Sequence, residues 1–481
     1  MSPRNFYFNI RCSYLSTYIL IAKIVKICNN TTMEMRRLLM PEIEEVIRQK
    51  DWKTLKGILS ELEPVDIAEM LEDIPYPEKV IIFRLLSKEQ ANETFSHMES
   101  DEQEEMLHYF NKSEIKDIIN GMDPDDRNDL FDELPAGLVK KYLELLTPDE
   151  REIAALLLNY PEHSAGHIMT TDFIELYEDM TADEAINYIR KNAKESETIY
   201  INYVIGHHRE LVGVVSLKDL ILAKPDNLVK EIMDVNPIYV RTMDDQEIVA
   251  NLMKKYDFLA IPVVDSEGRL VGIVTFDDIM DVIEDENTED FQRMAAMSPM
   301  ETPYFSINAV KLAWNRFVWI FVLVILESIS GNIIQRYQDI LKVVVALSIF
   351  IPMITDTGGN AGTQSSTIVI RGLATGDIEL KDVFRLILRE LLIGFLIAVA
   401  IGIVALFRAY FFHVSSMIAI TVAIALLITI FVSNLTGAFL PFLFKALKVD
   451  PAIAAGPFIT TIVDITGLVI YFEVAKRLLH I

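Results

Sequence analysis

The feature that most constrains this chain is a polar stretch, residues 352–371, inside an apolar segment that begins near residue 341. The stretch reads PMITDTGGNAGTQSSTIVIR and includes the acid Asp356. Lipid offers no hydrogen bonds to polar side chains or to irregular backbone, so such a stretch crosses a bilayer only where it faces protein or water. The sequence therefore predicts that something polar crosses the membrane here.

The charge of the chain is divided unevenly between an acidic part and an apolar part. Residues 301–481 hold 11 acidic and 13 basic residues, which leaves 59 acidic and 31 basic residues for residues 1–300. A part this acidic repels nucleic acid and anionic lipid and attracts cations. We therefore expect no nucleic-acid partner, and with 51% hydrophobic residues the whole chain is too apolar to be soluble.

Residues 1–33 look unlike the rest of the chain. They hold both cysteines, Cys12 and Cys28, so no disulfide framework is available and a reducing cytosol suits the soluble part. Their apolar run is interrupted by Lys23 and Lys26 and is too short to span a bilayer. We interpret these residues as a doubtful extension, from a misplaced start or as a weak membrane-associating segment.

Residues 34–164 show the pattern of short helices. An acid or threonine, then proline, then further acids recurs at 63–66, 123–126 and 147–150. Proline suits the first helical turn, and acids there are favoured by the helix dipole. The pattern predicts an all-α helical array, a type of structure more typical of docking surfaces than of enzymes.

Residues 165–283 contain an internal duplication. LVGVVSLKDL at 211–220 recurs as LVGIVTFDDI at 270–279, and an Ile-Met pair precedes each copy. Each copy predicts a buried strand followed by a helix. The repeat is similar to tandem CBS modules, α/β regulatory units that in many proteins sense adenine nucleotides or ions. A nucleotide at this pair is thus an expected partner, although the acidity of the second copy disfavours a polyanion there.

The duplication is followed by an acidic run at residues 277–290, and residues 284–314 then lead to the membrane as a predicted connecting helix. On a helix these carboxylates recur every three or four residues and repel one another. Mg²⁺ and Ca²⁺ prefer oxygen ligands and would reverse that repulsion. A solvated acidic linker is the alternative, but the position between a sensor module and the membrane favours cation binding.

Residues 315–481 predict a five-helix transmembrane domain. The basic residues flanking the spans favour cytoplasmic amino-terminal domains. The predicted spans are about 315–335, 341–370, 384–408, 416–444 and 452–476. The predicted fold class is therefore a multidomain membrane protein with a helical array, an α/β tandem module, a connecting helix and five transmembrane helices.

Three acids lie within these spans without a basic residue at similar depth: Glu327, Asp356 and Asp464. An unpaired ionised acid in the bilayer is costly, so a transported cation is the economical partner for Asp356 and Asp464. For Glu327 we favour a hydrogen bond between helices.

The motifs at 352–362, 456–467 and 164–169, together with the CBS pair, resemble those of the MgtE-type magnesium channels and transporters, over residues 34–481. The resemblance implies a homodimer in the plasma membrane, with Mg²⁺ as its ion and a connecting helix that plugs the pore. It implies that Asp464 is the main pore carboxylate. The other implied pore-lining residues are Gly359, Thr363, Thr367, Gly456 and Thr460, and the implied regulatory Mg²⁺ ligands are Asp278, Asp281, Glu286 and Glu289.

Other functions fit the sequence less well than Mg²⁺ transport. Asp356-Thr357-Gly358 spells an aspartic-protease-like triplet, but the other signatures of intramembrane proteases are missing, and we expect no enzyme. An anion channel is disfavoured because the acids at depth repel anions. A transporter of Co²⁺ or another divalent cation, or mainly a Mg²⁺ sensor, stays as the alternative. His163 and His167 could bind a transition metal, but no third ligand is evident, so we interpret them as structural.

Overall fold

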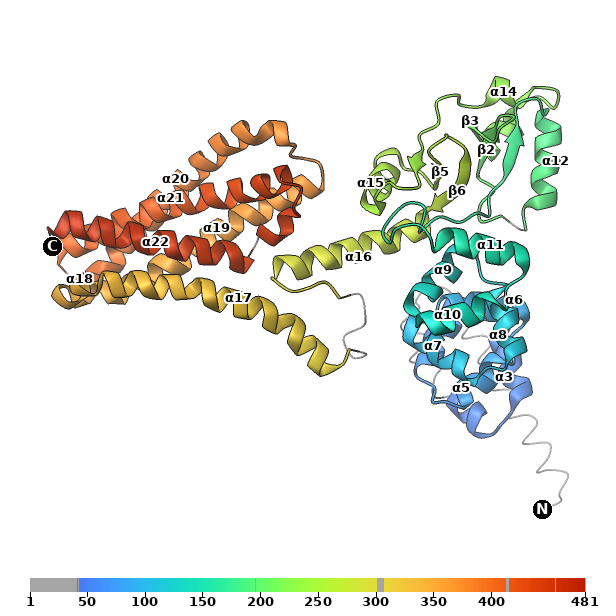
Figure 1. Ribbon diagram of the computed structural model, residues 1–481, viewed down its shortest axis with the longest axis horizontal. Helices are drawn as coiled ribbons and strands as arrows, with labels where there is room; N and C mark the ends of the chain where they lie inside the picture. The colour runs from blue at the N-terminus through green and yellow to red at the C-terminus, as the bar shows by residue number, and fades with distance from the viewer. Residues whose placement is uncertain are drawn as a thin grey trace, which may run out of the picture. The chain divides into compact units, whose positions relative to one another are not determined.

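The computed structural model describes residues 41, 43–194, 196–300, 307–411, 415–454 and 456–480. The predicted extension at residues 1–33 lies outside these described residues. The chain divides into two compact units, Met1–Ile283 and Glu284–Ile481, and each is described by itself (Figure 1).

The first unit begins with the predicted array of short helices. Its helices are α3 (Trp52–Leu59), α4 (Pro64–Glu72), α5 (Glu78–Phe83), α6 (Lys88–Ser96), α7 (Ser100–Tyr109), α8 (Lys112–Ile119), α9 (Pro124–Glu133), α10 (Ala136–Leu143) and α11 (Pro148–Leu157). The array surrounds one apolar core that includes Leu55, Ile67, Phe95 and Phe131.

Proline occupies the first turn of α4, α9 and α11, as the sequence predicts. Only one of the three preceding residues caps its helix by its side chain: the Thr147 hydroxyl accepts a hydrogen bond from the Glu150 amide at 3.3 Å. Glu63 and Asp123 make no such bond. The Asp123 carboxylate is therefore not used for capping.

The duplicated part of the first unit forms two three-stranded sheets. In each sheet the middle strand pairs in parallel with the first strand and antiparallel with the third. The strands are β1 (Glu175–Tyr177), β2 (Ile201–Ile205), β3 (Leu211–Ser216), β4 (Val240–Arg241), β5 (Ala260–Val264) and β6 (Leu270–Thr275). The helices are α12 (Ala182–Asn192), α13 (Leu217–Leu222), α14 (Val229–Ile232), α15 (Gln246–Tyr256) and α16 (Phe276–Met294). The predicted α/β duplication is confirmed.

In each half, one residue before the first strand or helix forms a β-bridge with the third strand of the other half's sheet. Thr170 follows the first Ile-Met pair and bridges Ile273 of β6, while Asp234 follows the second pair and bridges Val214 of β3. This reciprocal pairing makes the two halves one body.

The repeated glycine of the motif makes room for a methionine. A Cβ at Gly213 would lie 2.7 Å from the Met233 sulfur, and a Cβ at Gly272 would lie 2.5 Å from the Met169 sulfur. The Ile-Met pairs and the glycines therefore recur together because each methionine packs on the backbone of a glycine in the third strand of a sheet.

The second unit contains the end of α16 and the helices of the predicted membrane domain. They are α17 (Ala309–Arg336), α18 (Gln338–Val343), α19 (Ile351–Ala374), α20 (Val383–Phe411), α21 (Ser416–Ala446) and α22 (Gly456–Leu479), with 3₁₀ turns η1 (Val345–Phe350), η2 (Leu380–Asp382) and η3 (Pro451–Ala454).

The second predicted span is divided in the structure. The sequence predicts one segment over 341–370, but α18 and η1 come first and α19 begins at Ile351. Pro352 lies in the first turn of α19, where its missing N–H would have no helical partner in any case. The Tyr471 hydroxyl donates to the Leu347 carbonyl at 2.8 Å and ties η1 to α22.

Four stretches among the described residues are long and apolar enough to cross a membrane: α17, Leu380–Arg408, α21 and α22. At 24 residues α19 has the length of a span, but its polar residues keep it out of that set. It lies beside α21 and α22 (Figure 1). The five-helix domain thus consists of four apolar helices and one polar helix.

The glycines of α19 allow this close packing. A Cβ at Gly437 of α21 would lie 2.2 Å from the Gly362 carbonyl oxygen, and a Cβ at Gly358 would lie 2.8 Å from the Thr429 methyl group. The glycines that the sequence presents as unusual in lipid are therefore buried against neighbouring helices.

We expect Gly437→Ala to destabilise the membrane unit by about 1–3 kcal/mol, because the new Cβ would overlap a backbone oxygen that cannot move aside easily. The thermal midpoint of purified protein in detergent measures this loss. The control is Gly331→Ala in α17, since a Cβ there meets no atom within 4 Å. Equal midpoints for the two variants would contradict the close approach of α19 and α21.

Candidate ion pathway and acidic control site

Four polar side chains of α19 lie on a side that its neighbours leave uncovered. Asp356, Asn360, Gln364 and Thr367 are exposed, whereas the glycines and serines of the helix are buried. The four exposed residues are three or four positions apart, so they form one stripe along the helix. We call it the polar stripe of α19, and in a bilayer it must face water or protein.

Asp464 lies in α22 and carries a buried oxygen without a partner. Its Oδ1 atom accepts no hydrogen bond from the described residues. The carboxylates of Glu327 and Asp356 lie close enough to act on it electrostatically. The structure therefore brings together the three acids that the sequence places within the spans.

Glu327 lies in α17. It is exposed, and among the described residues no hydrogen bond joins it to another helix. The described part of the chain does not show the interhelical hydrogen bond expected for Glu327, and that assignment stays a prediction. Its carboxylate adds negative charge near Asp464.

The predicted pore-lining residues lie on α19 and α22. A Cβ at Gly359 would lie 2.8 Å from the Thr460 methyl group, and the Thr460 hydroxyl donates to the Gly456 carbonyl at 2.9 Å. Thr363 is half-buried and Thr367 is exposed on the polar side of α19. Gly359 and Thr460 are thus in contact, and the pore-lining role of all five residues stays a prediction.

A cluster of carboxylates joins the helical array to the α/β pair within the first unit. Its members come from α9, from the segment before β2 and from the first turn of α16. They are Asp125, Asp126, Asp129, Glu197, Asp277 and Asp278. We call them the acidic cluster. Asp278 accepts a hydrogen bond from the Thr275 hydroxyl at 2.5 Å, whereas Asp125 Oδ1 is buried and accepts none from the described residues.

Burial is the main reason why these acids are costly to ionise. It raises the pKa of Asp125, and the nearby Asp278 carboxylate raises it further. Burial likewise raises the pKa of Asp278, with Asp277 adding to the effect. The cluster therefore favours the uptake of positive charge.

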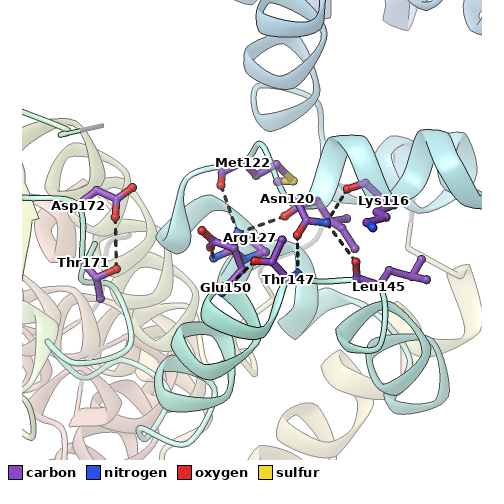
Figure 2. A network of polar contacts seen from close by, with 10 residues as sticks. Lys116, Asn120, Met122, Arg127, Leu145, Thr147, Glu150, Thr171 and Asp172 are labelled. Atoms are coloured by element: carbon purple, nitrogen blue, oxygen red, sulfur yellow. Dashed lines mark hydrogen bonds and ion pairs between the residues drawn. The ribbon is translucent and has the colours of Figure 1, made fainter. Parts of the chain in front are cut away.

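Arg127 of α9 forms an ion pair with Glu150 of α11 inside a network of polar contacts (Figure 2). Its side chain is fully buried and donates to Glu150 Oε2 at 2.5 Å and to the Met122 carbonyl at 3.4 Å. Asp172, from the segment before β1, lies within its electrostatic reach. Burial, then the charges of Asp123 and Glu150, nevertheless raise the pKa of Asp172 to about 6.

His167 anchors α9 to the segment that enters the α/β pair. Its Nε2 atom lies 2.5 Å from Asp132 Oδ2, and Asn128 Nδ2 donates to its carbonyl at 3.0 Å. The hydrogen bond with Asp132 raises the pKa of His167. His163 contacts Gln246 instead, at 3.2 Å. The two histidines do not converge on one point, in agreement with their structural interpretation.

The four predicted regulatory ligands are not gathered in one place. Asp278 belongs to the acidic cluster, Asp281 is exposed, Glu286 is half-buried, and Glu289 forms an ion pair with Arg293. Across the described ranges, no three His, Cys, Asp or Glu side chains are arranged to hold a metal ion. Their role as ligands stays a prediction.

Sequence reasoning missed the partners of Asp278 on α9. Asp125 and Asp126 belong to an Asp-Pro-Asp-Asp motif that was interpreted as a helix start. The signal was present, because the motif holds more acids than a helix start needs. Glu197 gives no such signal in the sequence.

Comparisons with known proteins agree with this architecture. Residues 351–474 match a family model described as a divalent cation transporter, residues 62–163 match the MgtE intracellular N domain, and 165–226 and 229–285 match CBS domains. The architecture is therefore that of a divalent cation transporter with a CBS pair.

Relatives match over almost the whole chain. The magnesium transporter MgtE of Thermus thermophilus is 36% identical over 93% of this chain and 100% of its own length. That of Bacillus subtilis is 36% identical over 90% of this chain and 96% of its own. The soluble part of a magnesium transporter, known as a crystal structure, is 32% identical with a TM-score of 0.50, and the match covers 52% of this chain and 99% of that one. The chain belongs to the MgtE family.

The raised pKa values give a test of the acidic cluster. A carboxyl whose pKa is higher in the folded state than in the unfolded state stabilises the fold least when it is ionised. In a buffer with EDTA, we therefore expect the stability of the first unit to fall as the pH rises from about 5 to about 8. The Asp125→Asn variant should lose less stability over this range, because it lacks one of these carboxyls.

The thermal midpoint at each pH provides the measurement, and Asp226→Asn, at an exposed position between α13 and α14, is the control. Identical pH profiles for wild type and Asp125→Asn would show that Asp125 is not held in an unfavourable environment.

Proposed function

We propose that this chain transports Mg²⁺ across a membrane along a pathway between α19 and α22. The observation that carries the proposal is the unpartnered buried oxygen of Asp464, with Glu327 and Asp356 close by. The basic residues of α17, α19 and α22 lie near the helix ends, at Lys311, Arg316, Arg336, Arg371, Lys476 and Arg477. A cation from solution is therefore the natural partner of these three acids.

The cost of placing ionised acids in the bilayer favours a divalent cation as their partner. One unpaired ionised acid near the bilayer centre costs about 3 kcal/mol on insertion scales. A hydrated Mg²⁺ would offset part of that cost for each carboxylate without direct coordination by all three. Mg²⁺ commonly keeps several waters and binds through one or two carboxylates, which fits a site without three convergent ligands. The full-length relatives named as magnesium transporters support the choice of ion.

We further propose that the protein acts as a homodimer. In a single chain the polar stripe of α19 is exposed, although lipid is an unsuitable environment for Asp356, Asn360 and Gln364. A second copy related by a two-fold axis would present the same stripe, so two copies would enclose a polar path between them.

The proposed location is the plasma membrane, with the first unit in the cytoplasm. Basic residues are more frequent at the flanks that this orientation places inside. The crystal structure of the soluble part of a related transporter supports a soluble first unit.

The acidic cluster is the proposed control site for cytosolic Mg²⁺. At low Mg²⁺ the cluster carboxylates repel one another and oppose the docking of α9 on the start of α16. At high Mg²⁺ a bound ion would reverse this repulsion and favour a compact first unit. Because α16 continues into the membrane unit, the state of the cluster would be transmitted to the pathway.

The pathway is tested by Asp464→Asn. This change keeps the shape of the side chain and removes its charge, so we expect Mg²⁺ flux into proteoliposomes to fall at least about tenfold, equivalent to about 1.4 kcal/mol. The flux can be followed with a Mg²⁺-sensitive dye. The control is Asp339→Asn, since Asp339 is exposed in α18 and its ion-pair partner among the described residues is Lys342. A wild-type rate for Asp464→Asn would refute the role of Asp464.

Flux measurements in the same proteoliposomes distinguish Mg²⁺ transport from the alternative functions. A transporter of another divalent cation would pass Co²⁺ in preference to Mg²⁺, and a pure sensor would pass neither. Mg²⁺ flux carried by the wild type and suppressed by internal Mg²⁺ is the result expected from the proposal.

Control by the acidic cluster is tested by Asp125→Asn combined with Asp278→Asn. The double variant lacks both the repulsion that opens the cluster and the ligands that respond to Mg²⁺. We therefore expect the ratio of flux at low internal Mg²⁺ to flux at high internal Mg²⁺ to fall several-fold. The control is again Asp226→Asn, and an unchanged ratio in the double variant would defeat the proposed control site.

A further inference from the structure

The last turn of α16 lies against the start of α22 within the second unit. The Arg293 guanidinium forms ion pairs with Glu289, one turn earlier in α16, and with Asp450, in the connection between α21 and α22. Arg293 is half-buried, as are both acids. Solvent screens such an ion pair less than one on the open surface.

Apolar and backbone contacts surround this ion pair. Met294 packs against the buried residues Ile370 of α19 and Ala452 of η3. A Cβ at Gly456 would lie 2.6 Å from the Met294 carbonyl oxygen, and Gly456 has a φ of +43°. Both the space and the backbone conformation therefore favour glycine here. The end of α16 is thus seated on the first residue of the helix that carries Asp464.

The charges around this contact are mostly negative. Glu286, Glu289 and Asp450 act on Asp290 together with Arg293. Burial, and then the charge of Asp450, raise the pKa of Asp290 to about 6 in spite of Arg293. Without the guanidinium, the carboxylates of α16 and the Asp450 carboxylate would repel each other. Arg293 is the cation of this contact that belongs to the chain itself.

We propose that the ion pair between Arg293 and Asp450 is a latch that holds the end of α16 at the entrance to the pathway between α19 and α22. Arg293 is a positioning residue: it acts through the placement of Met294 against Gly456, Ile370 and Ala452. At this contact the Arg293 guanidinium offsets the repulsion between carboxylates, as a bound Mg²⁺ is proposed to do at the acidic cluster. Closure at this end therefore needs no metal ion, and opening requires the ion pair to break.

The latch also changes the expected role of Glu289. Its carboxylate is already paired with Arg293 in the latched state. A Mg²⁺ ion would have to compete with the guanidinium for this ligand. Glu289 thus becomes available to a cation only as the latch opens. This inference rests on the proposed transport function.

The test is a double-mutant cycle with Arg293→Gln and Asp450→Asn in the full-length protein. Each single change should raise the residual Mg²⁺ flux at saturating internal Mg²⁺ at least about threefold, because the seat of α16 is weakened. The double variant should leak no more than the leakier single variant, since each change removes the same interaction between Arg293 and Asp450. The swap of Arg293→Asp with Asp450→Arg should restore part of the closure, and Arg293→Lys should leak less than Arg293→Gln.

A matched control is Arg477→Gln. Arg477 forms an i, i+4 ion pair with Glu473 near the C-terminal end of α22, so this change also removes an arginine from an ion pair on a helix. It should not leak. Single variants that close like the wild type, or leaks that add up in the double variant, would overturn the latch.

A second measurement does not depend on transport. Amide hydrogen exchange of residues 286–300 should accelerate in Arg293→Gln and Asp450→Asn and stay at the wild-type rate in Arg477→Gln. Unchanged exchange within α21 shows that the variants are folded. If the wild type carried no Mg²⁺ flux, the transport proposal would fail, yet the exchange rates would still decide whether this ion pair holds α16 in place.

Discussion

The structure depends on carboxylates that are placed where neither water nor a basic side chain neutralises them. Asp464, with Glu327 and Asp356 near it, is the case within the membrane helices, and Asp125 with Asp278 is the case in the first unit. Such groups are unfavourable unless positive charge arrives. This shared need for a cation connects the proposed pathway to the proposed control site in one chain.

Packing makes the membrane site possible. The glycines of α19 let α21 and α22 approach its backbone, as Gly437 approaches Gly362, and this approach commits one side of the helix to protein contacts. The residues of the polar stripe are then on the remaining side, whereas Ser365 and Ser366 are buried against the neighbouring helices. A helix with larger residues in place of these glycines could not pack so closely, and the stripe would have no fixed direction.

The chain neutralises some of its acids with its own cations and leaves others open. Arg127 is buried beside Glu150, and Arg293 lies between Glu289 and Asp450. Both arginines fix an element in position: α9 on α11, and the end of α16 on the start of α22. The acids without a resident cation, Asp125 and Asp464, keep buried oxygens that accept no hydrogen bond from the described residues. Only acids of the second kind call for a cation from solution, and this difference is the basis of the proposed control of the first unit by Mg²⁺.

The sequence by itself determined the helical array, the duplicated α/β pair, the membrane half and the position of Asp356 and Asp464 within it, because periodicity, repeats and acids within apolar segments are local patterns. The start of α19 at Ile351 was not predictable in this way, since the turn before it is fixed by a contact between Leu347 and Tyr471. Only the tertiary structure decided that α9 supplies the partners of Asp278 and that Arg293 reaches Asp450. These pairs lie far apart in the sequence, and charge acts through space, so no local pattern can reveal which acids and bases meet.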